Sequence, residues 1–278
     1  MNRHVEITAL ALLASAFAPG AAGAAETYHS CTGFIDSVPT TLVTQGVWCL
    51  RRNLSTAITS GAAITVGTNN ATIDCNGFKL GGLAAGSASQ AVGILSEERN
   101  NTSVRNCNVR GFHTGTRIWN GAGHVVEDSV FDSNLQYGIY MYASPADGNG
   151  TVRGNQVLDT GGADGALYSY GILAAGDVID NVVSGVFTSA ADGSAWGIYG
   201  GGLVQGNVVR RLFEQEQFTR GIATFHDDTI ISRNRLVGVT GTNSVGIYAT
   251  GDNTYCTDNI AVNFSTAYVS CEQMLDNL

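Results

Sequence analysis

The sequence is poor in lysine and in charged residues generally. It has one lysine, Lys79, beside thirteen arginines; charged residues make up 13% of the chain and the net charge is −9. The basic residues form no run or patch, which argues against a nucleic-acid partner. After the first 24 residues no apolar run is long enough to cross a bilayer, which argues against a membrane span.

Several catalytic and metal-binding signatures are also missing. The sequence has no C-x-x-C pair and no Cys/His spacing typical of zinc. It has no G-x-S-x-G, no phosphate loop and no dinucleotide fingerprint. Acidity does not exclude an anionic glycan as a partner, because a few arginines can create a local positive site.

The first 24 residues have the parts of a secretory signal peptide. A short basic start, Met1–His4, precedes an apolar run from Ile7 to Ala18, and small residues follow up to Ala24. The run is too short to span a bilayer, and the small residues fit a cleavage site. We therefore expect cleavage after Ala24 and a mature domain, residues 25–278, that is secreted or periplasmic.

Asparagine recurs at a near-constant step in the second half of the chain. Asn155, Asn181, Asn207, Asn234 and Asn259 are separated by 26, 26, 27 and 25 residues. Apolar residues stand three positions before and two positions after each of them, and most are β-branched, which favours strands. A step of this size is typical of solenoid repeats. Because the two apolar positions are an odd number apart, we expect a bend with the asparagine in the left-handed conformation.

The repeat extends toward the N-terminus with other residues at the asparagine position, where we place Asp128, Cys107 and Cys75. A second motif, Gly-Ile, recurs once per repeat and predicts another strand with isoleucine in the core. The pairs are Gly93-Ile94, Gly138-Ile139, Gly171-Ile172, Gly197-Ile198, Gly221-Ile222 and Gly246-Ile247. In one repeat we expect Arg117-Ile118-Trp119 in this place, with Arg117 instead of glycine.

Three short strands per repeat without helical periodicity predict an all-β fold, a single-stranded right-handed parallel β-helix solenoid of about 8–9 coils. Coils stack at the strand spacing of roughly 4.8 Å, so the rod would be about 40 Å long. We expect one domain. Residues 25–70 would form an N-terminal cap and first coil, residues 71–264 the repeats, and residues 265–278 the C-terminal end.

All six cysteines lie in the predicted mature domain. An even count in an exported chain favours disulfides. Cys75 and Cys107 would lie in one column of successive coils, within disulfide range, and the local pairs Cys31–Cys49 and Cys256–Cys271 would then tie down the two ends. Free thiols stacked at Cys75 and Cys107 are the alternative.

With its periodic asparagine, short strands and Gly-Ile columns, the segment from about Ala71 to Cys271 resembles the pectate-lyase-like superfamily of right-handed parallel β-helices. The resemblance implies that the Gly-Ile strand is the first strand of each coil and that a ligand cleft lies on its outer face. The marker clusters of its lyases, polygalacturonases and epimerases are absent: there is no Asn-Thr-Asp, Gly-His-Gly or Arg-x-Pro-x-x-Arg. The resemblance therefore selects no enzyme class.

A candidate binding face follows the isoleucines. Residues next to an inward isoleucine point outward, and aromatic rings suit the C–H faces of sugars. We expect the adjacent glycines to leave a shallow trough for a polysaccharide. The alternative is that exposed aromatics are present because they favour strands. The candidate substrate-binding residues are Trp119, Tyr140, Tyr142, Tyr199 and Tyr248.

The loops before these strands carry candidate catalytic residues. Asp164, Asp192 and Glu216 come from neighbouring coils, so two of them could act as acid and base on a glycosidic bond. Such stacked acids could instead bind Ca²⁺ through their oxygens. Arg220 belongs to the same group. Ordinary solvated loop acids are the alternative.

Arg117 and the turn around His226 are the remaining candidates. Arg117 would project into the trough and hold a uronate carboxylate, and the resemblance to β-helix lyases implies that an arginine can act as base. A cation–π contact is the alternative. His226 beside Asp227 is a candidate proton-transfer group with a raised pKa, whereas we expect Asp228 to be a turn residue.

We interpret the chain as a secreted protein that binds a polysaccharide and, if these residues are catalytic, cleaves it as a lyase or glycoside hydrolase. A non-catalytic glycan-binding or adhesion module and a structural exported β-helix are the alternatives.

Overall fold

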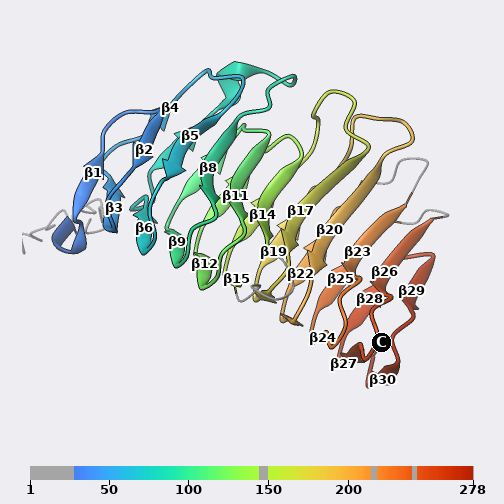
Figure 1. Cartoon of the computed structure of the whole chain (residues 1–278). Helices are drawn as coiled ribbons and strands as arrows, with labels where there is room; N and C mark the ends of the chain where they lie inside the picture. Colours follow the sequence, from blue (N-terminus) through green and yellow to red (C-terminus); the bar gives the residue numbers. More distant parts are fainter. Residues whose placement is uncertain (1–27, 144–149, 214–217, 240–242, 278) are drawn as a thin grey trace, which may run out of the picture.

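The computed structural model describes residues 28–143, 150–213, 218–239 and 243–277. The predicted signal peptide, residues 1–24, lies outside them. Within the described residues, the strands form three parallel sheets of eleven, ten and nine strands, which follow one another around a rod (Figure 1). The fold is a right-handed parallel β-solenoid of about eight turns, so the prediction of fold class is confirmed.

The strands are assigned to sheets A, B and C. Sheet A contains β1 (Gly33–Ile35), β3 (Gly46–Leu50), β6 (Ala71–Asp74), β9 (Thr102–Arg105), β12 (His124–Glu127), β15 (Gly150–Arg153), β18 (Asp177–Ile179), β21 (Leu203–Gln205), β24 (Ile230–Ser232), β27 (Tyr255–Thr257) and β30 (Gln273–Leu275). Sheet B contains β2 (Thr40–Leu42), β5 (Ala62–Val66), β8 (Val92–Glu97), β11 (Thr114–Trp119), β14 (Tyr137–Tyr142), β17 (Tyr168–Ala174), β20 (Ser194–Gly200), β23 (Thr219–Thr224), β26 (Ser244–Ala249) and β29 (Thr266–Val269). Sheet C contains β4 (Leu54–Ser55), β7 (Lys79–Gly81), β10 (Asn108–Arg110), β13 (Val130–Asp132), β16 (Gln156–Leu158), β19 (Val182–Ser184), β22 (Val208–Arg210), β25 (Arg235–Val237) and β28 (Ile260–Val262).

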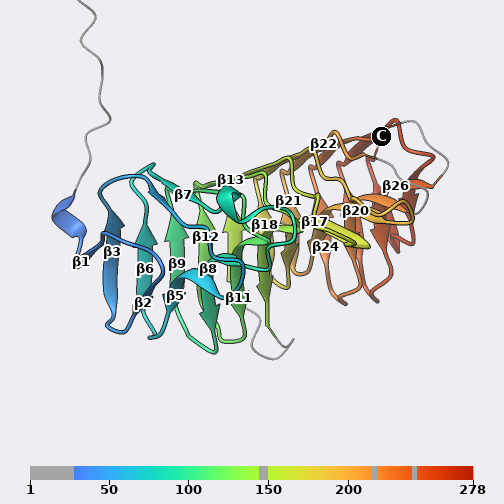
Figure 2. The ribbon, with the colours of Figure 1, turned by 90° about the horizontal axis from the view of Figure 1, so that it is seen from above.

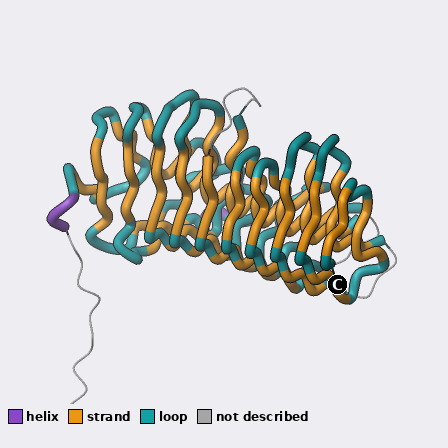
Figure 3. The backbone as a smooth tube through the Cα atoms, turned by 90° about the horizontal axis from the view of Figure 1, so that it is seen from below, coloured by secondary structure: helices purple, strands orange, loops and turns teal. Residues whose placement is uncertain are grey.

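Each coil runs from sheet B to sheet A to sheet C. Figure 2 shows the strands of successive coils side by side along the rod, and Figure 3 shows the loops in rows between them. Two short 3₁₀ turns, η1 (Tyr28–Ser30) and η2 (Leu83–Ala85), are the described helical elements. The isoleucines of the Gly-Ile motif are buried in a column inside sheet B, as the sequence predicts.

The glycines of the Gly-Ile motif also face the core, which corrects the predicted trough. A Cβ on Gly138 would lie 2.4 Å from the side chain of Val157 and 2.6 Å from the carbonyl oxygen of Gly171 in the next coil. The same crowding recurs at the other glycines of this column. They are glycine because sheet C side chains fill the space beside them, so they do not hollow the outer surface.

A ladder of buried asparagines joins the coils between sheets A and C. The side-chain oxygen of Asn207 accepts bonds from the backbone and side-chain nitrogens of Asn181, at 2.9 and 3.1 Å. Its amide nitrogen donates to the carbonyl of Val178, at 2.8 Å, and to Asn234. Asn277 ends the ladder by accepting both nitrogens of Asn259.

The prediction that the asparagines adopt the left-handed conformation is wrong: that conformation occurs one residue earlier in the chain. The positive φ angles fall on the residue before each ladder position, for example Asp180 at 53° and Gly206 at 69°. The asparagines themselves are not in that conformation; they carry the side-chain ladder.

Two predicted registers also shift. Ser129, not Asp128, takes the ladder position. Its backbone N–H donates a hydrogen bond to Oδ1 of Asn155, and its hydroxyl accepts one from the backbone N–H of Cys107. In sheet B, Thr116 pairs with Ile139, so Gly115 stands in the glycine column and Arg117 in the outward column.

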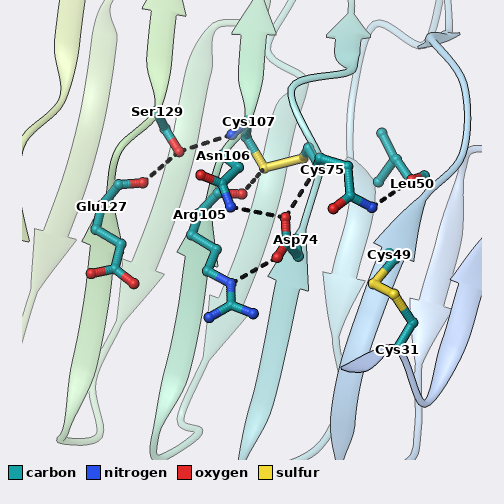
Figure 4. A network of polar contacts seen from close by, with 11 residues as sticks. Cys31, Cys49, Leu50, Asp74, Cys75, Arg105, Asn106, Cys107, Glu127 and Ser129 are labelled. Carbon is teal, nitrogen blue, oxygen red and sulfur yellow. Dashed lines mark hydrogen bonds and ion pairs between the residues drawn. A yellow bond between two sulfur atoms is a disulfide. The ribbon is translucent and has the colours of Figure 1, made fainter. Parts of the chain in front are cut away.

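Three disulfides join Cys31 to Cys49, Cys75 to Cys107 and Cys256 to Cys271, the pairs that the sequence favours. Cys75 and Cys107 lie in neighbouring coils, with Cα atoms 4.6 Å apart. Beside this bond, Arg105 and Asn106 both donate to Asp74 of the preceding coil (Figure 4). Several disulfides are typical of exported proteins.

A buried histidine predicts a loss of stability in acid. His124 is 3% exposed, and its Nδ1 accepts the backbone N–H of Thr102 at 3.3 Å. Burial lowers the pKa of His124, although a bond to the carbonyl of Asn120 opposes the shift. Because the folded pKa lies below the ordinary value of about 6.5, the unfolded chain binds the proton more tightly, and stability falls as the pH drops below about 6.5.

Urea unfolding at about pH 7.5 and about pH 5.5 measures this loss. We expect His124→Asn, which keeps an acceptor in reach of Thr102, to lose less stability between the two pH values than the wild type. Burial lowers the pKa of His113 and His226 in the same direction, so the variant keeps part of the dependence. Equal losses in variant and wild type would contradict the assignment to His124.

Candidate functional site

The outer face of sheet B carries aromatic residues in aligned columns. In one column, Tyr137 of β14 pairs with Tyr170 of β17, which pairs with Trp196 of β20. In the next, Tyr140 and Tyr199 lie two strands apart. Tyr140 and Tyr199 point outward because they alternate with the inward isoleucines. Tyr137, Tyr170 and Trp196 point outward because the glycine and the isoleucine that follow each of them both face the core, which interrupts the alternation. Parallel pairing in constant register then brings rings of successive coils together.

These rings form one continuous surface that we call the aromatic strip. Tyr137 and Tyr170 stack with their centroids 5.4 Å apart and their planes at 2°. Ring contacts lead from Tyr170 to Trp196 at 5.3 Å, and from Trp196 to Tyr199 at 6.2 Å. Further contacts extend the strip toward both ends of the rod. The strip consists of Trp119, Tyr137, Tyr140, Tyr142, Tyr170, Trp196, Tyr199, Phe225 and Tyr248.

An arginine lies over each end of the strip. The guanidinium of Arg117 is 5.6 Å from the ring centre of Trp119 and pairs loosely with Glu97, at 3.7 Å. The guanidinium of Arg220 lies 3.9 Å from the ring centre of Tyr248 and 4.4 Å from that of Trp196. The cation–π interpretation of Arg117 therefore matches its geometry, together with an ion pair.

Four tyrosines of the strip have a raised pKa and stay uncharged at neutral pH: Tyr137, Tyr140, Tyr170 and Tyr199. Burial raises the pKa of Tyr140 to about 12, with a further contribution from Tyr137, and the positive charge of Arg117 opposes it. Burial also raises the pKa of Tyr170 and Tyr199. Each phenol can therefore donate and accept a hydrogen bond without carrying charge.

The structure brings all five predicted substrate-binding residues into this strip. Tyr140, Tyr199 and Tyr248 lie in one column, and Trp119 pairs with Tyr142 in another. Sequence reasoning missed Tyr137, Tyr170, Trp196 and Phe225. A signal for the first three was present, because each stands directly before a Gly-Ile pair. Phe225 lies in a turn, outside the repeat pattern.

Arg220 lines a hollow of about 390 Å³ beside the strip, together with Asp192, Ser194 and Tyr168. Its Nε is buried and has no hydrogen-bond partner among the described residues. Asp164 is exposed on a neighbouring loop and does not line this hollow. Glu216, the other predicted acid, lies outside the described residues.

The turn after β23 holds His226 and Asp227. The ring of His226 packs edge-on against Tyr199 at 5.7 Å. Burial lowers the pKa of His226, although the Asp227 carboxylate raises it, so the predicted raised pKa is wrong. Asp227 accepts the backbone N–H of Asp252 at 2.8 Å. Asp228 has a φ of 55°, which agrees with its interpretation as a turn residue.

No group of three or more His, Cys, Asp or Glu side chains within the described ranges is placed to hold a metal ion. The search for membrane spans in the same residues found no helix long and apolar enough to cross a bilayer.

Comparison with known families gives two overlapping matches to one family model, the right-handed β-helix region, over residues 51–209 and 92–267. Together they cover most of the chain. A comparison with curated protein sequences gives no match.

Three solved structures align with this chain at low sequence identity. The Dettilon tailspike protein aligns with a TM-score of 0.46 and 14% identity, over 87% of this chain and 60% of its own. The A-module of the mannuronan C-5 epimerase AlgE6 from Azotobacter vinelandii aligns with a TM-score of 0.41 and 11% identity, over 84% of this chain and 80% of its own. The tailspike protein of E. coli bacteriophage HK620, solved with a pentasaccharide, aligns with a TM-score of 0.41 and 12% identity, over 90% of this chain and 56% of its own.

Proposed function

This chain belongs to the right-handed β-helix family, and we propose that on this scaffold it is an exported protein that binds a polysaccharide along the aromatic strip. The observation that carries the proposal is the unbroken ring contact from Trp119 to Tyr248 on one outer face. Exposed aromatic surface of this extent is unusual unless it binds something. Rings flanked by uncharged phenols suit sugars, which offer C–H faces for stacking and hydroxyls for hydrogen bonds.

The direction of the strip favours a polymer over a single sugar. It crosses the strands and so runs along the rod, from β11 to β26 in sheet B. Five steps at the strand spacing make roughly 24 Å, a length that spans several sugar rings. The three disulfides and the predicted signal peptide support export to a compartment where such polymers occur.

Removing two half-buried rings that lie far apart on the strip tests the proposal. We expect Tyr140→Ala and Tyr248→Ala each to weaken binding to a bound polysaccharide about tenfold, which corresponds to about 1.4 kcal/mol. Tyr140 and Tyr248 lie four strands apart, so the two losses should be nearly additive. Affinity gel electrophoresis of the mature, disulfide-bonded protein on neutral and uronate-containing polysaccharides measures the effect.

Tyr255→Ala is the matched control. Tyr255 is 38% exposed but lies on β27 of sheet A, away from the strip. Binding unchanged in the strip variants, or reduced equally by the control, would refute the proposal. Failure to bind any polysaccharide would favour the structural alternative.

Cleavage of the bound polymer is a second candidate function, and it rests on Asp192 and Arg220 sharing one hollow beside the strip. A carboxylate and a guanidinium in one hollow can divide proton transfer and charge stabilisation between them. If the protein cleaves, Asp192→Asn should abolish the release of reducing ends and unsaturated products and leave polymer binding intact. Product release that survives this change would exclude Asp192 from the chemistry.

A further inference from the structure

A second hollow lies on the opposite side of the strip, at the turns that lead from sheet B to sheet A. Its volume is about 720 Å³. The turns after β17 and β20 have two residues each, Ala175-Gly176 and Gly201-Gly202, whereas the turn after β23 runs from Phe225 to Thr229. Short turns beside a long turn make a step in the surface, and the hollow occupies that step.

Two glycines on the floor of this hollow are closely packed against neighbouring turns. A Cβ on Gly201 would lie 3.0 Å from the ring of His226, and a Cβ on Gly176 would lie 2.2 Å from the carbonyl oxygen of Gly150. Any larger side chain at these two positions would have to displace its neighbour. Glycine at these positions therefore keeps the floor of the hollow in its present close packing.

The walls offer hydrogen-bond acceptors and one exposed ring. Asp177 and Asp227 each use Oδ1 on a backbone amide, at 3.0 Å to Leu203 and 2.8 Å to Asp252. These bonds hold the carboxylates in place and leave Oδ2 of each without a bond to any described group.

Phe225 connects this hollow to the strip. It is 45% exposed and lines the hollow, and its ring lies 5.6 Å from that of Tyr199 and 5.8 Å from that of Tyr248. A sugar seated on Tyr199 and Phe225 would therefore have the hollow directly at its side.

On the basis of the proposed polysaccharide binding, we propose that this hollow holds a neutral branch sugar of the chain that lies on the strip. Carboxylate oxygens suit hydroxyl groups, and the Phe225 ring suits a sugar face. Asp177, Asp227 and Asp228 line the hollow, and their negative charges disfavour an acidic branch.

Pairs of polysaccharides that share a main chain and differ in branching test this proposal. The probes are galactomannans of high and low galactose content, arabinoxylan before and after removal of arabinose, and a pectin before and after removal of its neutral side chains. We expect the wild type to bind the more branched member of at least one pair about tenfold more tightly. Ala175→Leu, which fills the floor, should abolish this preference and leave binding of the less branched member unchanged.

Two matched variants separate the hollow from the strip. Ala122→Leu makes the same change in the turn after β11, whose residues do not line the hollow, and should keep the preference. Tyr140→Ala should weaken binding to both members of a pair equally. Equal wild-type affinity within all three pairs, or a preference that survives Ala175→Leu, overturns the branch hollow while strip binding stands. Absence of binding to every polymer overturns both proposals.

Discussion

Asn207→Ala is expected to lower the free energy of unfolding by about 3 kcal/mol or more, because it leaves buried polar groups without partners. The change removes the acceptor of the Asn181 backbone N–H and the donor to the Val178 carbonyl. It also breaks the side-chain bonds to Asn181 and Asn234. Asn207 is fully buried, so water cannot replace these bonds, and each unpaired buried group costs about 1–3 kcal/mol.

Chemical denaturation of the disulfide-bonded protein measures this loss. Gln156→Ala, on the exposed outer face of β16, is the control and should change stability by less than about 0.5 kcal/mol. Asn277→Ala should cost less than Asn207→Ala, because Asn277 makes similar bonds but is only partly buried at the end of the ladder. Equal stability of Asn207→Ala and the wild type would show that the ladder does not hold the coils together.

The sequence predicts the coil and its three strands because the repeat is long and regular, yet it leaves the register of irregular coils open. Val125 and Val126 are both apolar, so either can serve as the inward residue before the bend, and the prediction took the wrong one. Ile118 pairs with Met141, which is a second inward position, two residues after the isoleucine of the Gly-Ile pair. The prediction placed Ile118 in the isoleucine column, and this displaced Arg117 by two residues. The second error arises from the two-residue period of strands, whereas the first is a one-residue slip between two apolar neighbours.

The candidate site was only partly predictable for a different reason. Outward columns follow from alternation, so Tyr140, Tyr199 and Tyr248 could be assigned from the isoleucine position alone. The hollow beside Phe225 depends on the contrast between short and long turns, which has no repeat period from which it can be predicted. Arg220 lies on β23 directly before Gly221-Ile222 and pairs with Trp196, so its outward column could have been predicted from the same signal as that of Tyr137.

Gly197→Ala is expected to destabilise the protein by about 3 kcal/mol through overpacking, at the upper end of the usual range. The added Cβ would lie 2.5 Å from the carbonyl oxygen of Gly221 in the next coil and 2.5 Å from Cγ1 of Val209. A side chain can turn aside, but a carbonyl within a parallel sheet cannot move without disturbing its strand. Gly197 does not have a positive φ, so the cost comes from contact alone and not from backbone strain.

The same reasoning gives a control and a rescue. Gly81→Ala should be nearly neutral, because its Cβ would meet the nearest atoms at 3.7 and 3.8 Å, which is ordinary contact. Combining Gly197→Ala with Val209→Ala removes one of the two clashes, so the double variant should lose less stability than the sum of the single losses. Thermal and urea unfolding of the four proteins measure the coupling. Strictly additive losses would mean that the side chains of sheet C do not restrict the first position of the Gly-Ile motif to glycine. The inward direction assigned to these glycines would then be wrong.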